Sequence, residues 1–282
     1  MRISINVITC LLISIASLAQ SNTAMYYQDK AEEYIRKKDY KGAMKTLTLA
    51  INEMPDSISL YDMRGALFEA FSNYEAAIKD FTSAIEKSED NTLTSHLLAN
   101  RGGTKYRIRD FEGSYSDLIL AVQLDSMNID ALNNLAAVCK EINRPEDALK
   151  YLNQIILIDS TYSPAYVNLG FTYQEMQQHE KAIVFFDKAV ELAPEEALGY
   201  SNRSFSKLKK NDLKGAMNDI NQSIKLMPSN SYAYKIRALI EIEKGKLVNA
   251  CKDLTRSIEL GYTQQYGEEV NELKSKYCNK SH

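Results

Sequence analysis

Small residues recur every 34 residues along most of this chain. Counting from Ala24, the eighth residue of successive units is small. The residues in this column are Ala31, Gly65, Gly102, Ala136, Gly170, Ser204 and Ala238. The twentieth residue is also small in every unit. A period of this length is typical of repeat architectures, in which one supersecondary unit stacks on the next.

Larger apolar residues occupy two further columns of the same units. Position 24 of each unit holds Leu, Phe or Ile, and position 28 holds Ile or Val. Positions 20, 24 and 28 lie on one face of a helix, because residues four apart are neighbours on its surface. Two antiparallel helices per unit would place the small residues at positions 8 and 20 opposite each other, where they allow close approach of the backbones. The pattern therefore predicts a series of helical hairpins, with the turn near positions 15 to 17.

These columns resemble the tetratricopeptide repeat family over residues 24–264. The resemblance implies an all-α, right-handed superhelical solenoid of seven repeats. The expected repeats span residues 24–57, 58–91, 95–128, 129–162, 163–196, 197–230 and 231–264. Thr92, Leu93 and Thr94 lengthen the link between the second and third repeats, which predicts a longer loop or a small stacking defect there. Residues 265–282 are expected to form a capping helix and a tail, since the end of a solenoid needs a helix that covers the last core layer.

The first residues differ from the repeats and resemble an export signal. Met1 and Arg2 give a short positive end, residues 3–18 are mostly apolar, and small residues precede Gln20. This pattern predicts a signal peptide at residues 1–19, cleaved after Ala19, and hence a periplasmic or secreted protein. The alternative is an uncleaved membrane anchor, but the run is shorter than the roughly 20 apolar residues of a spanning helix.

Export would place three cysteines of the mature chain in an oxidising compartment. Cys251 and Cys278 could meet if the terminal helix folds back, whereas Cys139 is expected to be a small buried apolar residue. Whether the two form a disulfide stays open at this point, because the geometry is not visible in the sequence.

Four units carry Arg at position 7 together with Asp at position 23, and the other three carry neither. The pairs are Arg64 with Asp80, Arg101 with Asp117, Arg203 with Asp219, and Arg237 with Asp253. Positions 7 and 23 are equally distant from the turn, so we expect a structural ion pair between the two helices of each such unit.

Neither the composition nor the motifs of the sequence indicate a catalytic site. The formal net charge is −3 and no basic block occurs, which argues against a nucleic-acid partner. His96, His179 and His282 lie in distant units without metal-ligand spacing, and no phosphate loop or nucleophile elbow is present. The sequence therefore predicts no enzyme activity, no cofactor and no metal.

The resemblance implies instead a concave groove formed by the first helices, faced by positions 2, 5, 6, 9, 12 and 13 of each unit. Four asparagines occupy position 6, namely Asn100, Asn134, Asn168 and Asn202. An amide donates and accepts, so this row could pair with the backbone of a bound peptide. Alternatively, Asn is simply common at this position and serves local interactions. The family's peptide-carboxylate clamp, which binds chaperone tails, is not matched. Position 5 of the third to sixth units holds Ala99, Asn133, Val167 and Ser201 instead of lysine.

A second candidate surface is apolar and belongs to the last three units. Its residues are Val167, Phe171, Leu198, Phe205, Leu208, Tyr232, Leu239 and Ile242. They could receive an amphipathic helix or an apolar strand, or they could pack against the neighbouring unit.

We therefore expect an exported scaffold or adaptor that binds another protein or peptide in its groove. The alternatives are a structural subunit of an envelope-associated assembly and, less favoured, a carrier of a carbohydrate or small ligand. Contact with a membrane is expected only through an uncleaved signal segment.

Overall fold

The computed structural model describes residues 23–278, and within them every regular element is a helix. The predicted all-α class is therefore confirmed. The contacts divide the chain into two compact units, one ending at Ile142 and the other beginning at Asn143. The predicted signal peptide at residues 1–19 lies outside the described residues.

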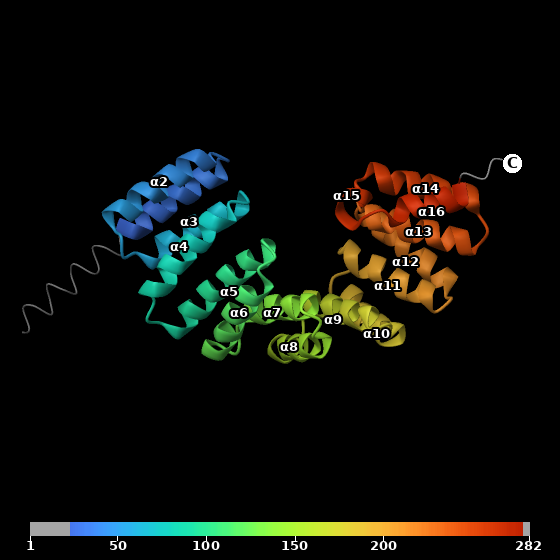
Figure 1. The fold of residues 1–282 in the computed structure, drawn as a ribbon, viewed down its shortest axis with the longest axis horizontal. Coiled ribbons are helices and arrows are strands. Elements are labelled where there is room, and N and C mark those ends of the chain that lie inside the picture. Colours follow the sequence, from blue (N-terminus) through green and yellow to red (C-terminus); the bar gives the residue numbers. More distant parts are fainter. Residues whose placement is uncertain (1–22, 279–282) are drawn as a thin grey trace, which may run out of the picture. The chain divides into compact units, whose positions relative to one another are not determined.

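The first unit is a stack of antiparallel helices that begins with a helical segment at residues 23–36. The helices that follow are α2 (Tyr40–Glu53), α3 (Ile58–Ala70), α4 (Tyr74–Lys87), α5 (Asn91–Arg107), α6 (Phe111–Leu124) and α7 (Ile129–Glu141). Each packs against the next, and α5 also contacts α3 and α7 directly (Figure 1). The helices α3, α5 and α7 therefore form one layer of the unit.

The second unit repeats this arrangement. Its helices are α8 (Pro145–Ile158), α9 (Ser163–Glu175), α10 (His179–Leu192), α11 (Ala197–Lys209), α12 (Leu213–Leu226), α13 (Ser231–Glu243), α14 (Leu247–Glu259), α15 (Tyr262–Tyr266) and α16 (Glu269–Cys278). Here α11 contacts both α9 and α13, so these three helices form the equivalent layer.

The turn inside each hairpin has the same backbone conformation throughout. The residue at position 15 of every unit has a positive φ, between 58° and 69°. These residues are Lys38, Ser72, Arg109, Asn143, Gln177, Asn211 and Gly245. In four hairpins the next residue is an Asp or Asn whose side chain accepts a hydrogen bond at the start of the following helix, as Asp39 does from Gly42 N. The turn thus combines a left-handed residue with a helix N-cap.

Small residues allow the two helices of a hairpin to approach closely. A Cβ atom on Gly170 would lie 2.6 Å from the ring of Phe186, which is fully buried. In another hairpin Ser114 Oγ donates a hydrogen bond of 2.7 Å to Gly102 O, which joins positions 20 and 8. In these hairpins the small residues at positions 8 and 20 therefore lie where the two helices approach closely.

The extra residues at 92–94 do not form a longer loop, so the first of the two alternatives was wrong. They belong to α5, which has 17 residues, whereas α3 has 13. Asp90 caps the helix by accepting from Leu93 N, and Thr94 Oγ1 donates to Asp90 O at 2.7 Å. Since neither Gly nor Pro interrupts residues 91–98, the insertion extends the helix by about one turn.

The predicted cap at 265–278 is not one continuous helix. Gly267 has φ 91° and separates the short α15 from α16. Val270 on α16 and Tyr262 on α15 are buried against the last core layer, with Ala238 and Leu254. The segment covers the end of the unit, but its helix begins at Glu269 because the left-handed glycine breaks the chain direction.

Within residues 23–278, no helix is long and apolar enough to cross a membrane.

Candidate functional site

A groove of about 480 Å³ opens on the layer formed by α3, α5 and α7 in the first unit. Its lining comprises Glu69, Ala99, Asn100, Gly103, Tyr106, Arg107, Asp130, Asn134 and Ala137. Every one of these residues occupies position 2, 5, 6, 9, 12 or 13 of its predicted unit. The groove therefore lies on the face that the sequence assigned to partner binding.

Small residues form the middle of the groove. Ala99 is buried, and Gly103 and Ala137 also carry little or no side chain. A Cβ atom on Gly103 would lie 3.3 Å from the side-chain nitrogen of Asn134, which is tighter than an ordinary contact. Gly103 thus leaves room for the Asn134 amide.

Two of the four predicted asparagines, Asn100 and Asn134, line this groove together. Asn100 Nδ2 donates a hydrogen bond of 3.1 Å to Asp62 Oδ1, and its amide oxygen takes no part in that bond. Burial raises the pKa of Asp62, while the bond from Asn100 opposes that shift. Within residues 23–278, Asn134 has no hydrogen-bond partner, so its donor and acceptor are both available.

Charged side chains border the groove, and the sequence analysis did not single them out. Glu69, Arg107 and Asp130 have no ion-pair partner among the described residues. Tyr106 OH donates to Glu141 Oε1 at 3.1 Å, and burial together with this bond raises the pKa of Tyr106. These residues occupy positions 2, 12 and 13 of their predicted units, which are groove positions. Their positions in the repeat could therefore have identified them as groove residues from the sequence.

The other two asparagines, Asn168 and Asn202, belong to the second unit and are half-buried there. The structure places them on α9 and α11, at the same helical position as Asn100 and Asn134.

Most of the predicted apolar surface is packed into the core of the second unit. Phe205, Leu208, Tyr232 and Leu239 contact the buried cluster formed around Ile220 and Ile236. Ile242 packs against the cluster beneath the cap, and Val167 and Phe171 are half-buried. Leu198, with 51% of its surface exposed, is the one that the structure leaves clearly open. Five of these side chains therefore pack between hairpins, which was the alternative that the sequence left open. Partner binding by this surface stays a prediction.

Charged groups cover what remains of the apolar side chains. Lys235 is 5% exposed, and its Nζ lies 3.0 Å from Glu269 Oε1 on the cap. Lys209 and Lys235 both lie over the ring of Phe205, at 5.2 and 5.6 Å from its centroid. Burial raises the pKa of the neighbouring Tyr232, so this phenol stays neutral.

All four expected Arg–Asp pairs form bidentate bridges between the two helices of a hairpin. In each, Nε and Nη2 of the arginine donate to the two carboxylate oxygens, as in Arg64 to Asp80 at 2.7 and 2.8 Å. The same geometry recurs for Arg101 with Asp117, Arg203 with Asp219, and Arg237 with Asp253. Planar guanidinium groups suit this two-point contact, so the pairs define the register of each hairpin.

The third nitrogen of each arginine reaches the preceding hairpin. Arg203 Nη1 lies 2.8 Å from Asp187 Oδ1 on α10, and Arg64 Nη1 donates to Thr48 Oγ1 on α2 at 3.3 Å. Arg101 and Arg237 make equivalent contacts with Thr82 and Asn221. One side chain therefore links two successive hairpins as well as the two helices of its own.

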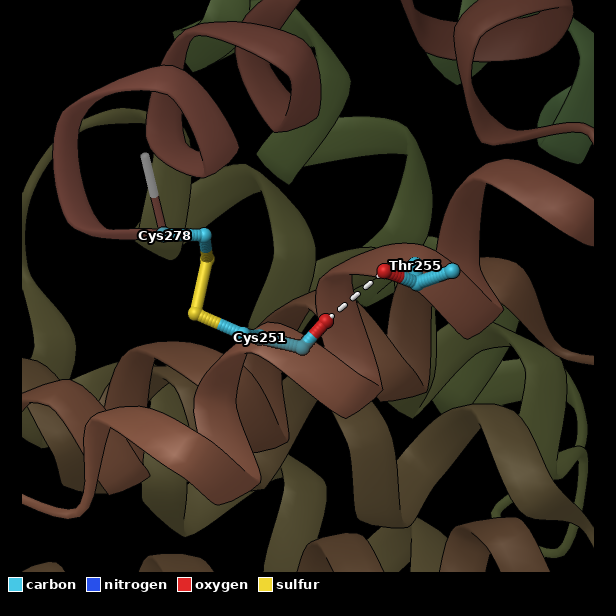
Figure 2. The surroundings of a disulfide bond; sticks show 3 residues. All are labelled: Cys251, Thr255 and Cys278. Atoms are coloured by element: carbon cyan, nitrogen blue, oxygen red, sulfur yellow. Dashed lines mark hydrogen bonds between the residues drawn. A yellow bond between two sulfur atoms is a disulfide. The ribbon is translucent and has the colours of Figure 1, made fainter. Parts of the chain in front are cut away.

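Cys251 on α14 and Cys278 on α16 are joined by a disulfide (Figure 2). Cys139 is buried, as expected, and is not part of this bond. The two Cα atoms are 5.7 Å apart, and the hydrogen bond from Thr255 Oγ1 to Cys251 O marks the turn of α14 beside the bond. The bond fastens the C-terminal helix to the last hairpin.

Among residues 23–278, no group of three or more His, Cys, Asp or Glu side chains could hold a metal ion.

Comparison with known proteins agrees with this architecture. The family model of the tetratricopeptide repeat matches residues 163–196, which comprise α9 and α10. A tetratricopeptide repeat protein from Parabacteroides merdae superposes with a TM-score of 0.73 and 16% sequence identity, over 90% of this chain and 99% of that chain. YrrB, described as a tetratricopeptide protein with an unusual peptide-binding site, superposes with a TM-score of 0.51 and 18% identity, over 66% of this chain and 95% of that chain.

One curated relative is RNA polymerase II-associated protein 3 of Xenopus tropicalis, which is 24% identical over 119 residues. That match covers 42% of this chain but only 18% of the relative's length. The chain thus contains a tetratricopeptide repeat, and its fold is that of a tetratricopeptide helical solenoid.

Proposed function

We propose that this protein is a scaffold that binds an extended segment of another protein in the groove of α3, α5 and α7. The observation that carries the proposal is the pair of asparagine amides, one of them without an internal partner among the described residues, beside a floor of small residues. A peptide backbone needs alternating donors and acceptors, and the amides of Asn100 and Asn134 offer both. A narrow floor lets that backbone come within hydrogen-bonding distance of them. YrrB, which shares the fold, is described as binding a peptide.

We further propose that the hairpins between residues 24 and 264 are seven repeats of one type, closed by a cap at 265–282. Three features support this proposal. The left-handed residue occurs at position 15 of all seven units. The family match at 163–196 has the bounds of one unit. The buried Val270 and Tyr262 cover the last hairpin.

The protein is proposed to act after export, in the periplasm or outside the cell. The signal-like residues 1–19 support this location, and so does the disulfide between Cys251 and Cys278, since such bonds persist in oxidising compartments. Mass spectrometry of the mature protein tests it: a chain that begins at Gln20 is expected, and a chain that retains Met1 and is found in the cytosol would contradict export.

The groove is tested by affinity capture with two matched variants. Asn134→Ala removes a side chain without an internal partner among the described residues, so stability should be unchanged while partner capture falls. Asn202→Ala makes the same change in the second unit and serves as the control. Retention of capture by Asn134→Ala, with loss in Asn202→Ala, would move the binding site to the second unit.

A further inference from the structure

Two acidic side chains and one basic side chain border the groove of the first unit, and the two acidic ones lie at opposite edges. Because each second helix reverses the chain direction, α3, α5 and α7 run the same way. Glu69 is the penultimate residue of α3, whereas Asp130 is the second residue of α7. These two carboxylates therefore stand at diagonally opposite corners of the groove.

The diagonal between these corners crosses the uncharged middle of α5. Asn100 and Gly103 lie in the central part of that helix, and Asn134 follows one turn after Asp130 on α7. Arg107 is the last residue of α5, so it lies at the same edge as Glu69 and not at the middle of α5, where the diagonal crosses. A ligand on the diagonal would meet a carboxylate, then small residues and amides, and then a second carboxylate.

The length of this path can be compared with that of an extended chain. Packed helices are about 8–10 Å apart, so α3 and α7 are separated by roughly 18 Å across α5. Glu69 is at position 12 of its unit and Asp130 at position 2, and this difference of ten residues adds about 15 Å along the helix axes. The diagonal is thus about 23 Å long, which an extended peptide covers with about seven residues at roughly 3.3 Å each.

Resting on the proposed function, we propose that the ligand is an extended peptide with two basic side chains about seven residues apart, one pairing with Glu69 and the other with Asp130. The residues between them are small or uncharged, because Ala99, Gly103 and Ala137 allow close approach and the asparagine amides read the backbone. Complementary charge at both ends fixes the direction and register of the peptide and speeds its association.

Fluorescence anisotropy with synthetic peptides tests this proposal. The probe is a labelled serine-glycine peptide of about nine residues with two lysines about seven residues apart. Matched peptides carry glutamates or glutamines at the same places, and a fourth carries the two lysines side by side. The separated lysines should bind about tenfold more tightly than the glutamines, since each exposed pair contributes up to about fivefold. Raising salt from about 50 to about 300 mM should remove most of that difference.

The paired variant Glu69→Gln with Asp130→Asn should reduce binding of the lysine peptide about tenfold and leave the glutamine peptide unchanged. The control is Glu75→Gln with Glu112→Gln, which removes two exposed carboxylates from α4 and α6, outside the groove lining. Circular dichroism checks that both variants fold.

The outcomes separate the two proposals. Equal binding of adjacent and separated lysines, tighter binding of the glutamate peptide, no measurable binding of the lysine peptide, or no effect of the groove variant would overturn the charge pattern. If Asn134→Ala still weakens the peptides that do bind, the groove remains the binding site and only the charge pattern is lost. If Asn134→Ala changes the binding of no peptide, the groove itself is the wrong site.

Discussion

The residue at position 15 determines the geometry of each hairpin turn. Six of the seven are not glycine, although a left-handed backbone costs an ordinary residue about 1–2 kcal/mol. The sequence could not reveal this conformation, because Lys, Ser, Arg, Gln, Asn and Gly share the column. The polar residue that follows was predictable, since Asp and Asn are the usual N-caps of helices.

Replacing Gln177 by Gly should stabilise the protein by about 0.5–1 kcal/mol, because it removes strain at a residue with φ 59°. The reverse change, Gly245→Ala, should destabilise by about 1 kcal/mol. No atom lies within 4 Å of the added Cβ, so the backbone alone causes that loss. Urea denaturation of both variants measures the two values. The two variants should change the free energy of unfolding in opposite directions. A loss of stability in Gln177→Gly would show that the Gln177 side chain makes a stabilising contact.

Between helices, the sequence predicted the Arg–Asp pairs but not their third contact. The pairing was visible because both columns vary together across the units. The acceptor on the preceding hairpin was not, since Thr48, Thr82, Asp187 and Asn221 share only the ability to accept a hydrogen bond. The fifth predicted unit has apolar side chains at positions 7 and 23 instead, Leu169 on α9 and Phe185 on α10.

This natural alternative supplies a test of what the ion pair contributes. Arg203→Leu alone should cost about 2–3 kcal/mol, because the buried Asp219 keeps only Lys207 as a partner. The double variant Arg203→Leu with Asp219→Phe copies the apolar solution and should recover at least about 1 kcal/mol of that loss. Thermal and urea denaturation of the single and double variants give the coupling energy. A double variant less stable than the single one would show that the ion pair itself is required.

His179 lies at the contact between α10 and α11, where we expect it to make stability depend on pH. The side chain is 7% exposed, its ring meets the edge of Phe205, and its Nδ1 has no partner among the described residues. Burial, assisted by Lys209 and Lys210, lowers its pKa, although Glu180 opposes the shift. The folded protein therefore resists protonation at a pH where the unfolded chain, with a pKa of about 6.5, accepts it.

Stability should consequently be unaffected by His179 above about pH 6.5 and should fall as the pH drops below that value towards the folded pKa. His179→Gln cannot titrate, so its melting temperature should decline less between pH 7 and pH 5. Melting curves of both proteins across this range provide the comparison. Parallel curves would mean that the imidazole is solvated and titrates normally in the folded state.

The apolar candidates show what a column number leaves undecided. Groove positions were assigned by number, and the assignment cannot distinguish a side chain on the open face from one that leans onto the neighbouring helix. Phe205, Tyr232 and Leu239 are large enough to reach the next hairpin, and they do so. The small residues Ala99, Gly103 and Ala137 of the first unit do not, and the groove opens over them.

At the scale of the whole molecule, each repeat of a solenoid contacts only the adjacent repeats, so a local change in stability affects mainly those repeats. The fold was predictable because each layer repeats the same contacts, and one correct hairpin implies the others. The disulfide was not predictable, since whether Cys278 reaches Cys251 depends on the break at Gly267 and the angle at which α16 returns. Its effect should accordingly be local.

Closing a loop with a sequence separation of 27 residues should stabilise the folded state by about 3–4 kcal/mol in the chain-entropy account. Reduction, or the double variant Cys251→Ser with Cys278→Ser, should remove that contribution and loosen α16, exposing Val270 and Tyr262. Hydrogen exchange should therefore rise in α14 and α16, whereas residues 23–142 should keep their protection, because a nearest-neighbour stack does not carry the loss that far. Adding reductant to the serine variant controls for effects elsewhere and should change nothing. Faster exchange in the first unit after reduction would mean that the cap stabilises the entire solenoid.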